Sequence, residues 1–238
     1  MKLLISNQHG AIIMALMPFL YGMSLTTPVW QHIFLLFAWC SLYLMTYPFF
    51  NLFKGKNLAL YQKWTLIYGS AALLFALPAL WHNWRIICFV TAMLPFALVN
   101  LYYIKQKNER ALLNDLSGIL IFTLAGMAAY YFPNGQFDAN IYQVALYPTL
   151  FFSGTTLYVK SVLRERKNPR YLQASIIFHL LCVLIFALLQ QYWLSATFLP
   201  PLIRAFWLPQ RKLSAKQIGL TEIAVSLLFF VMLLIATV

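Results

Sequence analysis

The chain is poor in charge, and poorest in acidic residues. Of its 238 residues only 9% are charged and five are Asp or Glu, whereas 62% are hydrophobic. A water-soluble domain carries about 25% charged residues. A folded surface that faces water needs such polar side chains. The composition therefore excludes an ordinary soluble globular protein and favours one whose surface faces lipid.

Cysteine and the familiar catalytic motifs are also scarce. The three cysteines, Cys40, Cys88 and Cys182, lie in separate apolar runs and show no CxxC spacing. Disulfide frameworks and zinc sites need paired cysteines, so these are interpreted as small buried side chains. The sequence has no P-loop, GxSxG, HExxH or dinucleotide fingerprint. We therefore expect no metal and no cofactor.

Long apolar runs, by contrast, fill the chain. A membrane-spanning helix needs about 20 mostly apolar residues. Nine segments meet or nearly meet that length: 10–27, 29–52, 64–81, 85–104, 115–132, 140–159, 171–190, 193–209 and 218–237. The segment 193–209 is the weakest, because Pro200, Pro201 and Arg204 interrupt it. The prediction is an all-α membrane protein, a bundle of about nine transmembrane helices forming a single polytopic domain over residues 1–238.

The basic residues give the expected orientation. With the N-terminus inside, fifteen of the seventeen Lys and Arg residues fall in inner segments. Arg85 lies in an outer loop and Arg204 lies within a span. The positive-inside rule then predicts an inner-membrane-type protein with the N-terminus in the cytoplasm and the C-terminus outside. Because the basic residues occupy short loops and not one folded face, no nucleic-acid partner is expected.

Polar residues at the start of the first span form one candidate site. His9 follows Asn7 and Gln8 and precedes Gly10 at the expected inner end of the span. Its imidazole can bind a ligand or titrate near neutral pH. The alternative is an ordinary helix start with Asn7 as its cap.

A second candidate site precedes the span 115–132. Arg110, Asn114 and Gly118 share one face by their four-residue spacing if that helix begins early, and a close-packed Gly118 would then floor a pocket. Asp115 lies beside them. The alternative is that Asn114 or Asp115 caps the helix.

A third candidate site follows the span 140–159 and is rich in cations. Lys160, Arg164 and Lys167 would fall on one side if the helix continues, with Arg166 beside them. Arginine forks bind phosphate or carboxylate through two hydrogen bonds. The alternative is a basic anchor that contacts anionic headgroups without selectivity.

Polar side chains within the apolar runs form the fourth candidate. Ser175 and His179 face the same way on one helix, and His179 lies at the depth of the hydrocarbon region. A histidine there is a functional-site candidate. The alternative is a neutral histidine bonded to a neighbouring helix. Arg204 and Glu222 can pair across helices, which we interpret as a structural contact.

These residues resemble the bacterial YwiC-like family of multi-pass membrane proteins. The resemblance rests on Gln8-His9-Gly10-Ala11 with Pro18 and Gly22, on Asn108-Glu109-Arg110 with Asn114-Asp115, and on Tyr158-Val159-Lys160-Ser161 with Arg164-Glu165-Arg166, Ser175 and His179. It runs through most of the chain. The family has no defined activity, so the resemblance implies a membrane protein and no particular reaction.

The expected architecture is also similar to the UbiA-type prenyltransferases. The similarity lies in nine helices with polar loops on the inner side, and in Tyr102-Tyr103-Ile104-Lys105 leading to Gly118. In those enzymes, aspartate-rich motifs after helices 2 and 6 hold magnesium against a prenyl diphosphate. Here residues 51–63 contain no carboxylate, and Lys160, Arg164 and Arg166 surround a single Glu165. The comparison therefore implies that arginines grip an anionic headgroup directly, without magnesium.

Three functions follow as hypotheses. The first is binding of an anionic or isoprenoid-type membrane lipid in a cytoplasm-facing cavity, with no reaction or with a metal-independent transfer to a membrane lipid substrate. The second is transport of a small solute or anion, supported by the interrupted helices and intramembrane His179 and Arg204. The third is a noncatalytic assembly partner of a membrane complex.

Overall fold

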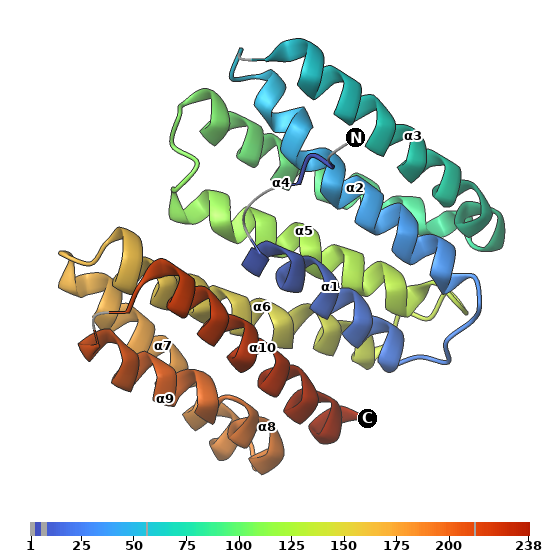
Figure 1. Ribbon diagram of the computed structural model, residues 1–238. Helices are drawn as coiled ribbons and strands as arrows, with labels where there is room; N and C mark the ends of the chain where they lie inside the picture. The colour runs from blue at the N-terminus through green and yellow to red at the C-terminus, as the bar shows by residue number, and fades with distance from the viewer. Residues whose placement is uncertain (1–2, 6–8, 56, 212) are drawn as a thin grey trace. The chain divides into compact units, whose positions relative to one another are not determined.

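The computed structural model describes residues 3–5, 9–55, 57–211 and 213–238 (Figure 1). Within these residues the chain forms ten α-helices, one π-helix and two short 3-10 helices, and no strand. The chain divides into an N-terminal unit, Met1–Ala145, and a C-terminal unit, Leu146–Val238.

The described part of the N-terminal unit holds five complete α-helices and the beginning of a sixth. They are α1 (His9–Ser24), α2 (His32–Leu52), α3 (Leu58–His82), the 3-10 helix η1 (Trp84–Ile86), α4 (Ile87–Lys105), α5 (Leu112–Tyr131) and α6 (Ala139–Val159). Helix α1 packs on α5, α4 packs on α5, and α2 packs on α3.

The C-terminal unit begins within α6 and contains shorter elements. They are the π-helix η2 (Lys160–Arg164), α7 (Pro169–Leu188), α8 (Tyr192–Thr197), α9 (Leu199–Trp207), the 3-10 helix η3 (Leu208–Gln210) and α10 (Ala215–Thr237). Helices α8 and α9 pack against both α7 and α10. A set of aromatic rings fills the centre, where Phe151 stacks on Phe229 with ring centroids 4.0 Å apart.

Among the described residues, six helical segments are long and apolar enough to cross a membrane: α2, α3, η1 with α4, α5, α7 and α10. Their outer faces are strongly hydrophobic. On α3, for example, Leu66, Leu73 and Leu77 are 69%, 71% and 66% exposed and share one face. An apolar surface repeated over several helices needs lipid to cover it. The chain is therefore a multi-pass membrane protein.

The expected span 193–209 is not one helix. It consists of α8 and α9, which are separated at Phe198. Pro200 and Pro201 have no backbone N–H and cannot continue a preceding helix, so the chain restarts at Leu199. The helices run on without interruption through Pro18, Pro78 and Pro95.

Close backbone contact fixes α1 against α5 in the N-terminal unit. A Cβ atom added to Gly22 would collide with the carbonyl of Gly126, and one added to Gly126 would collide with that of Pro18. Only glycine permits helices to approach so closely. The tight crossing thus depends on two residues that have no side chain.

Polar contacts mark the two ends of this unit. At one end Lys54 Nζ, after α2, lies 2.7 Å from Glu109 Oε1, after α4. At the other, Asn83 Nδ2, after α3, donates to the carbonyl of Phe132 at 2.9 Å. Connections two helices apart in sequence therefore lie at the same end, as the alternating crossing of a membrane requires.

Candidate functional site

The centre of the candidate site is Arg204 on α9, which is only 3% exposed. Its Nη1 pairs with Glu222 Oε2 on α10, which confirms the pair expected from the sequence. Nη1 and Nη2 each lie 3.4 Å from Thr155 Oγ1 on α6, and Nη2 lies 3.2 Å from His179 Nε2 on α7. Four helices thus converge on one guanidinium. We call Thr155, Tyr158, Ser175, His179, Arg204 and Glu222 the Arg204 cluster.

The hydrogen bonds of His179 determine its tautomer. Nδ1 lies 2.7 Å from the carbonyl oxygen of Ser175, which can only accept. Nδ1 therefore carries the proton, and Nε2 is free to accept from Arg204. Gly154 makes room for this ring, because a Cβ atom there would lie 2.8 Å from Nε2. This geometry is that of a neutral histidine bonded to a neighbouring helix.

Tyr158 covers the guanidinium from another side. Arg204 Cζ lies 4.4 Å from the centroid of the Tyr158 ring, within the range of a cation–π contact. The ring itself is fully buried. Its face is the negative side of the π quadrupole, so it stabilises the buried cation.

The hydrogen bonding of this cluster is incomplete. Among the described residues, four of its buried polar atoms have no hydrogen-bond partner: Tyr158 Oη, Ser175 Oγ, Arg204 Nε and Glu222 Oε1. A buried polar group without a partner is costly, and such groups are rare in native proteins. The cluster therefore has hydrogen-bond donors and acceptors that no described residue uses.

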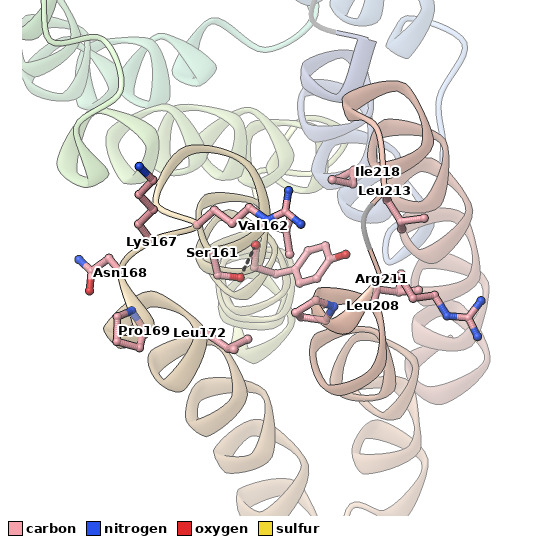
Figure 2. Close-up of a pocket in the computed structure, with 13 residues that line it drawn as sticks. Ser161, Val162, Lys167, Asn168, Pro169, Leu172, Leu208, Arg211, Leu213 and Ile218 are labelled. Carbon is pink, nitrogen blue, oxygen red and sulfur yellow. Dashed lines mark hydrogen bonds between the residues drawn. The ribbon is translucent and has the colours of Figure 1, made fainter.

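A pocket of about 260 Å³ adjoins the cluster (Figure 2). Its polar lining consists of Tyr158, Ser161, Arg166, Lys167, Asn168 and Arg211. Its apolar lining consists of Val162, Pro169, Leu172, Leu208, Pro209, Leu213 and Ile218. None of the lining residues that the structure describes is acidic. Figure 2 shows Lys167 and Arg211 on opposite sides of this basic pocket.

The predicted cationic site is only partly realised at this pocket. Arg166 lines it, but Lys160 and Arg164 do not. The expectation that Lys160, Arg164 and Lys167 share one side is wrong: Lys160 is buried, whereas Arg164 and Lys167 are exposed. The reason is that α6 ends in a π-helix, closed by a bond from the Glu165 N–H to the Lys160 carbonyl, and not in a further α-helical turn.

Ser175 and His179, by contrast, face one buried interior as expected. Both belong to the Arg204 cluster and are at most 2% exposed. The residues that sequence reasoning missed lie on the other side of the pocket, at the junction of α9 and α10. In the sequence, Arg211 is one of the basic residues that predict the orientation and carries no other signal. The Arg204–Glu222 pair is the signal that these two helices meet.

The site predicted before the fifth span has a different geometry. Helix α5 begins at Leu112 with extended Ala111 as its cap, so Arg110 precedes the helix and shares no helical face with Asn114. Asn114 does not cap the helix, since its Nδ2 donates to the Glu109 carbonyl at 2.8 Å. Asp115 lies in the first turn. A Cβ atom on Gly118 would meet nothing within 4 Å, so this glycine is not close-packed.

Two further expectations concern His9 and metal binding. His9 begins α1, but its side chain lies outside the described residues, as do Asn7 and Gln8. In the part of the chain that the structure describes, no three His, Cys, Asp or Glu side chains come together in a way that could hold a metal ion.

Known proteins support the family resemblance. The family described as "YwiC-like protein" matches residues 5–130. The chain is 40% identical over 223 residues to an "Uncharacterized protein YwiC" of Bacillus subtilis, with 94% of this chain and 93% of that protein covered. It is 64% identical over 237 residues to an "Uncharacterized protein" of Haemophilus influenzae, with 100% of both covered. No solved structure matches. The chain belongs to the YwiC-like family.

Proposed function

We propose that the basic pocket binds the anionic headgroup of an amphipathic lipid at the cytoplasmic face of the membrane. The observation that carries this proposal is the charge of the lining: Arg166, Lys167 and Arg211 are present without an acidic partner in the described lining. Arginine and lysine together suit a phosphate or carboxylate group, which they bind by forked and single hydrogen bonds.

The volume of the pocket limits which part of the ligand it holds. Sites for drug-sized ligands measure about 300–1,000 Å³, so a pocket of about 260 Å³ suits a headgroup and its first carbons. The seven apolar lining residues suit the start of an acyl or isoprenyl chain. The rest of that chain extends into the bilayer, against the apolar outer faces of the helices.

The proposed setting is a bacterial inner membrane crossed by nine segments. In this arrangement α8 and α9 together make one crossing, the N-terminus is cytoplasmic and the C-terminus is outside. The concentration of Lys and Arg in alternate connections supports it. The bundle would be UbiA-like. Its Arg and Lys side chains would bind the anionic headgroup directly, in the place where the magnesium-binding aspartates hold it in UbiA-type enzymes. We propose a binding protein and assign no reaction.

Native mass spectrometry of the detergent-purified protein tests this function. Three probes distinguish the sources of the anion: inorganic phosphate, lysophosphatidic acid and farnesyl monophosphate. Farnesol and monopalmitoylglycerol supply the same chains without the charge. We expect one of the charged lipids to bind stoichiometrically and the two neutral lipids to bind no more than the detergent background.

A matched pair of variants separates the pocket from general surface charge. Arg166→Gln/Lys167→Gln removes one Arg and one Lys from the lining, and Arg170→Gln/Lys216→Gln removes the same charges from exposed positions outside it. We expect binding to be lost in the first variant and kept in the second. An equal loss of lipid binding in both variants would mean that Arg166 and Lys167 act only as nonspecific basic anchors. Binding of inorganic phosphate without either charged lipid would indicate a site for a soluble anion.

A transporter is the second candidate, supported by buried Arg204 on the interrupted α8–α9 segment. Intramembrane charges and broken helices are typical of substrate pathways. Uptake of labelled phosphate into proteoliposomes tests it. Accumulation that the Arg204→Gln variant abolishes would favour transport over lipid binding.

A further inference from the structure

We propose that Arg204 is an inner anion-binding residue of the same site, and that Glu222 occupies it in this structure as an exchangeable internal partner. When the headgroup in the basic pocket moves inward, it replaces the Glu222 carboxylate on the guanidinium. Glu222 then takes up one proton. This inference rests on the proposed function and adds a second position for the anion, together with a proton that accompanies it.

The first support is the incomplete bonding of the pair. Arg204 uses Nη1 on a single oxygen of Glu222, and its Nε has no partner among the described residues. The other oxygen, Glu222 Oε1, is also without one. A pair whose only role is structural gains most from forked geometry with two parallel hydrogen bonds. Here the guanidinium keeps a donor for a second anion.

The second support is the position of the basic pocket. Leu208 follows Arg204 by four residues, Ile218 precedes Glu222 by four, and both line the pocket. Four helical residues rise about 6 Å. Tyr158 lines the pocket and also carries the guanidinium on its ring. The ring of Tyr158 therefore lies between the pocket and Arg204, and the proposal requires this ring to rotate.

The third support is the balance of charge. The charged and titratable groups around Glu222 are Arg204 on α9, with Tyr158 on α6 and His179 on α7 in contact with that guanidinium. If an incoming anion takes Arg204, a buried carboxylate is left without a cation, which is strongly unfavourable. The carboxylate takes up one proton from the bulk solvent and becomes a neutral acid, and Arg204 stays charged with the ligand as its partner. Each bound anion thus brings in one proton.

The experiment measures lysophosphatidic acid binding by full-length protein in detergent over the neutral pH range. The variants are Glu222→Gln, Arg204→Gln/Glu222→Gln, and Glu109→Gln as a control that removes an exposed carboxylate. Because Glu222→Gln has no internal anion, we expect it to bind roughly tenfold more tightly than wild type and to lose the pH dependence that Glu222 contributes. The double variant should lose this gain, and Glu109→Gln should match wild type.

Infrared difference spectra of wild type supply a measurement that needs no variant. Addition of the lipid should produce the carbonyl band of a newly protonated carboxylic acid. No such band, or equal affinity and equal pH dependence in wild type and Glu222→Gln, would overturn the exchange while leaving the outer pocket intact. Failure of wild type to bind any charged probe would overturn the proposed function and this inference together.

Discussion

His179 Nε2 lies 3.2 Å from Arg204 Nη2, so a histidine on α7 accepts a hydrogen bond from an arginine on α9 within the apolar interior. The bond requires the proton of His179 to be on Nδ1, which donates a hydrogen bond to the Ser175 carbonyl at 2.7 Å. The neutral imidazole ring of His179 therefore links helix α7 to Arg204 on helix α9. A neutral acceptor keeps the net charge of the cluster lower than a protonated ring would.

Replacement of His179 tests the role of this acceptor. His179→Leu removes one acceptor of Arg204 Nη2 and leaves it only the longer contact to Thr155 Oγ1. We expect a loss of about 1–3 kcal/mol in the free energy of unfolding. His179→Gln keeps an acceptor at similar depth and should retain much of that stability. Unfolding by SDS in mixed micelles gives both values, and a leucine variant as stable as wild type would contradict the assigned bond.

The buried ion pair predicts strong coupling between Arg204 and Glu222. Arg204→Met leaves a buried carboxylate unpaired, and Glu222→Leu leaves a buried guanidinium unpaired, so each should cost about 3–5 kcal/mol. The double variant removes both charges and should cost much less than the sum of the two. A double-mutant cycle measures this difference. Additive losses would mean that the two side chains do not interact.

The α1–α5 crossing predicts that similar glycines respond differently to the same change. Gly22→Ala and Gly126→Ala each place a methyl group against backbone of the facing helix, so we expect each to cost at least about 1–3 kcal/mol. Gly118→Ala, on the same α5, meets open space and should gain up to about 1 kcal/mol from helix propensity. Thermal unfolding in detergent compares the three, and similar losses in all would refute the tight crossing.

The orientation of the chain is tested with paired reporters. Alkaline phosphatase fused after Val238 should be active, and the same enzyme fused after Lys107 should be inactive, because phosphatase folds only outside the cytoplasm. Green fluorescent protein should give the opposite pattern at the two positions. The reverse result at both positions would place the N-terminus outside.

The helices could be predicted from the sequence because each apolar run is close to the length of a membrane crossing. All nine expected segments coincide with helices or, at 193–209, with a broken pair. The largest shift is at α3, which begins at Leu58 and not at 64. Gln62 and Lys63 interrupt the apolar pattern near the start of this helix, so hydropathy alone places the beginning of the span after them.

Part of the candidate site could be predicted for a similar reason. Arg204, Glu222 and His179 stand out because ionisable groups at that depth need partners. The basic pocket could not be predicted, since the turn after η2 and the junction of α9 and α10 build it together. The π-helix could not be predicted from the sequence either. The change from i→i+4 to i→i+5 hydrogen bonds shifts the register of the side chains, but no particular residue types mark it.

The break at Phe198 has a consequence for biogenesis. Helices α8 and α9 have six and nine residues, so they rise about 9 Å and about 13 Å, short of the roughly 30 Å hydrocarbon layer. Arg204 adds an insertion cost of about 2.5–3.5 kcal/mol. This segment is therefore a poor substrate for the translocon by itself. We expect it to remain at the interface until α10 has been synthesised and Glu222 can accompany Arg204 into the bilayer.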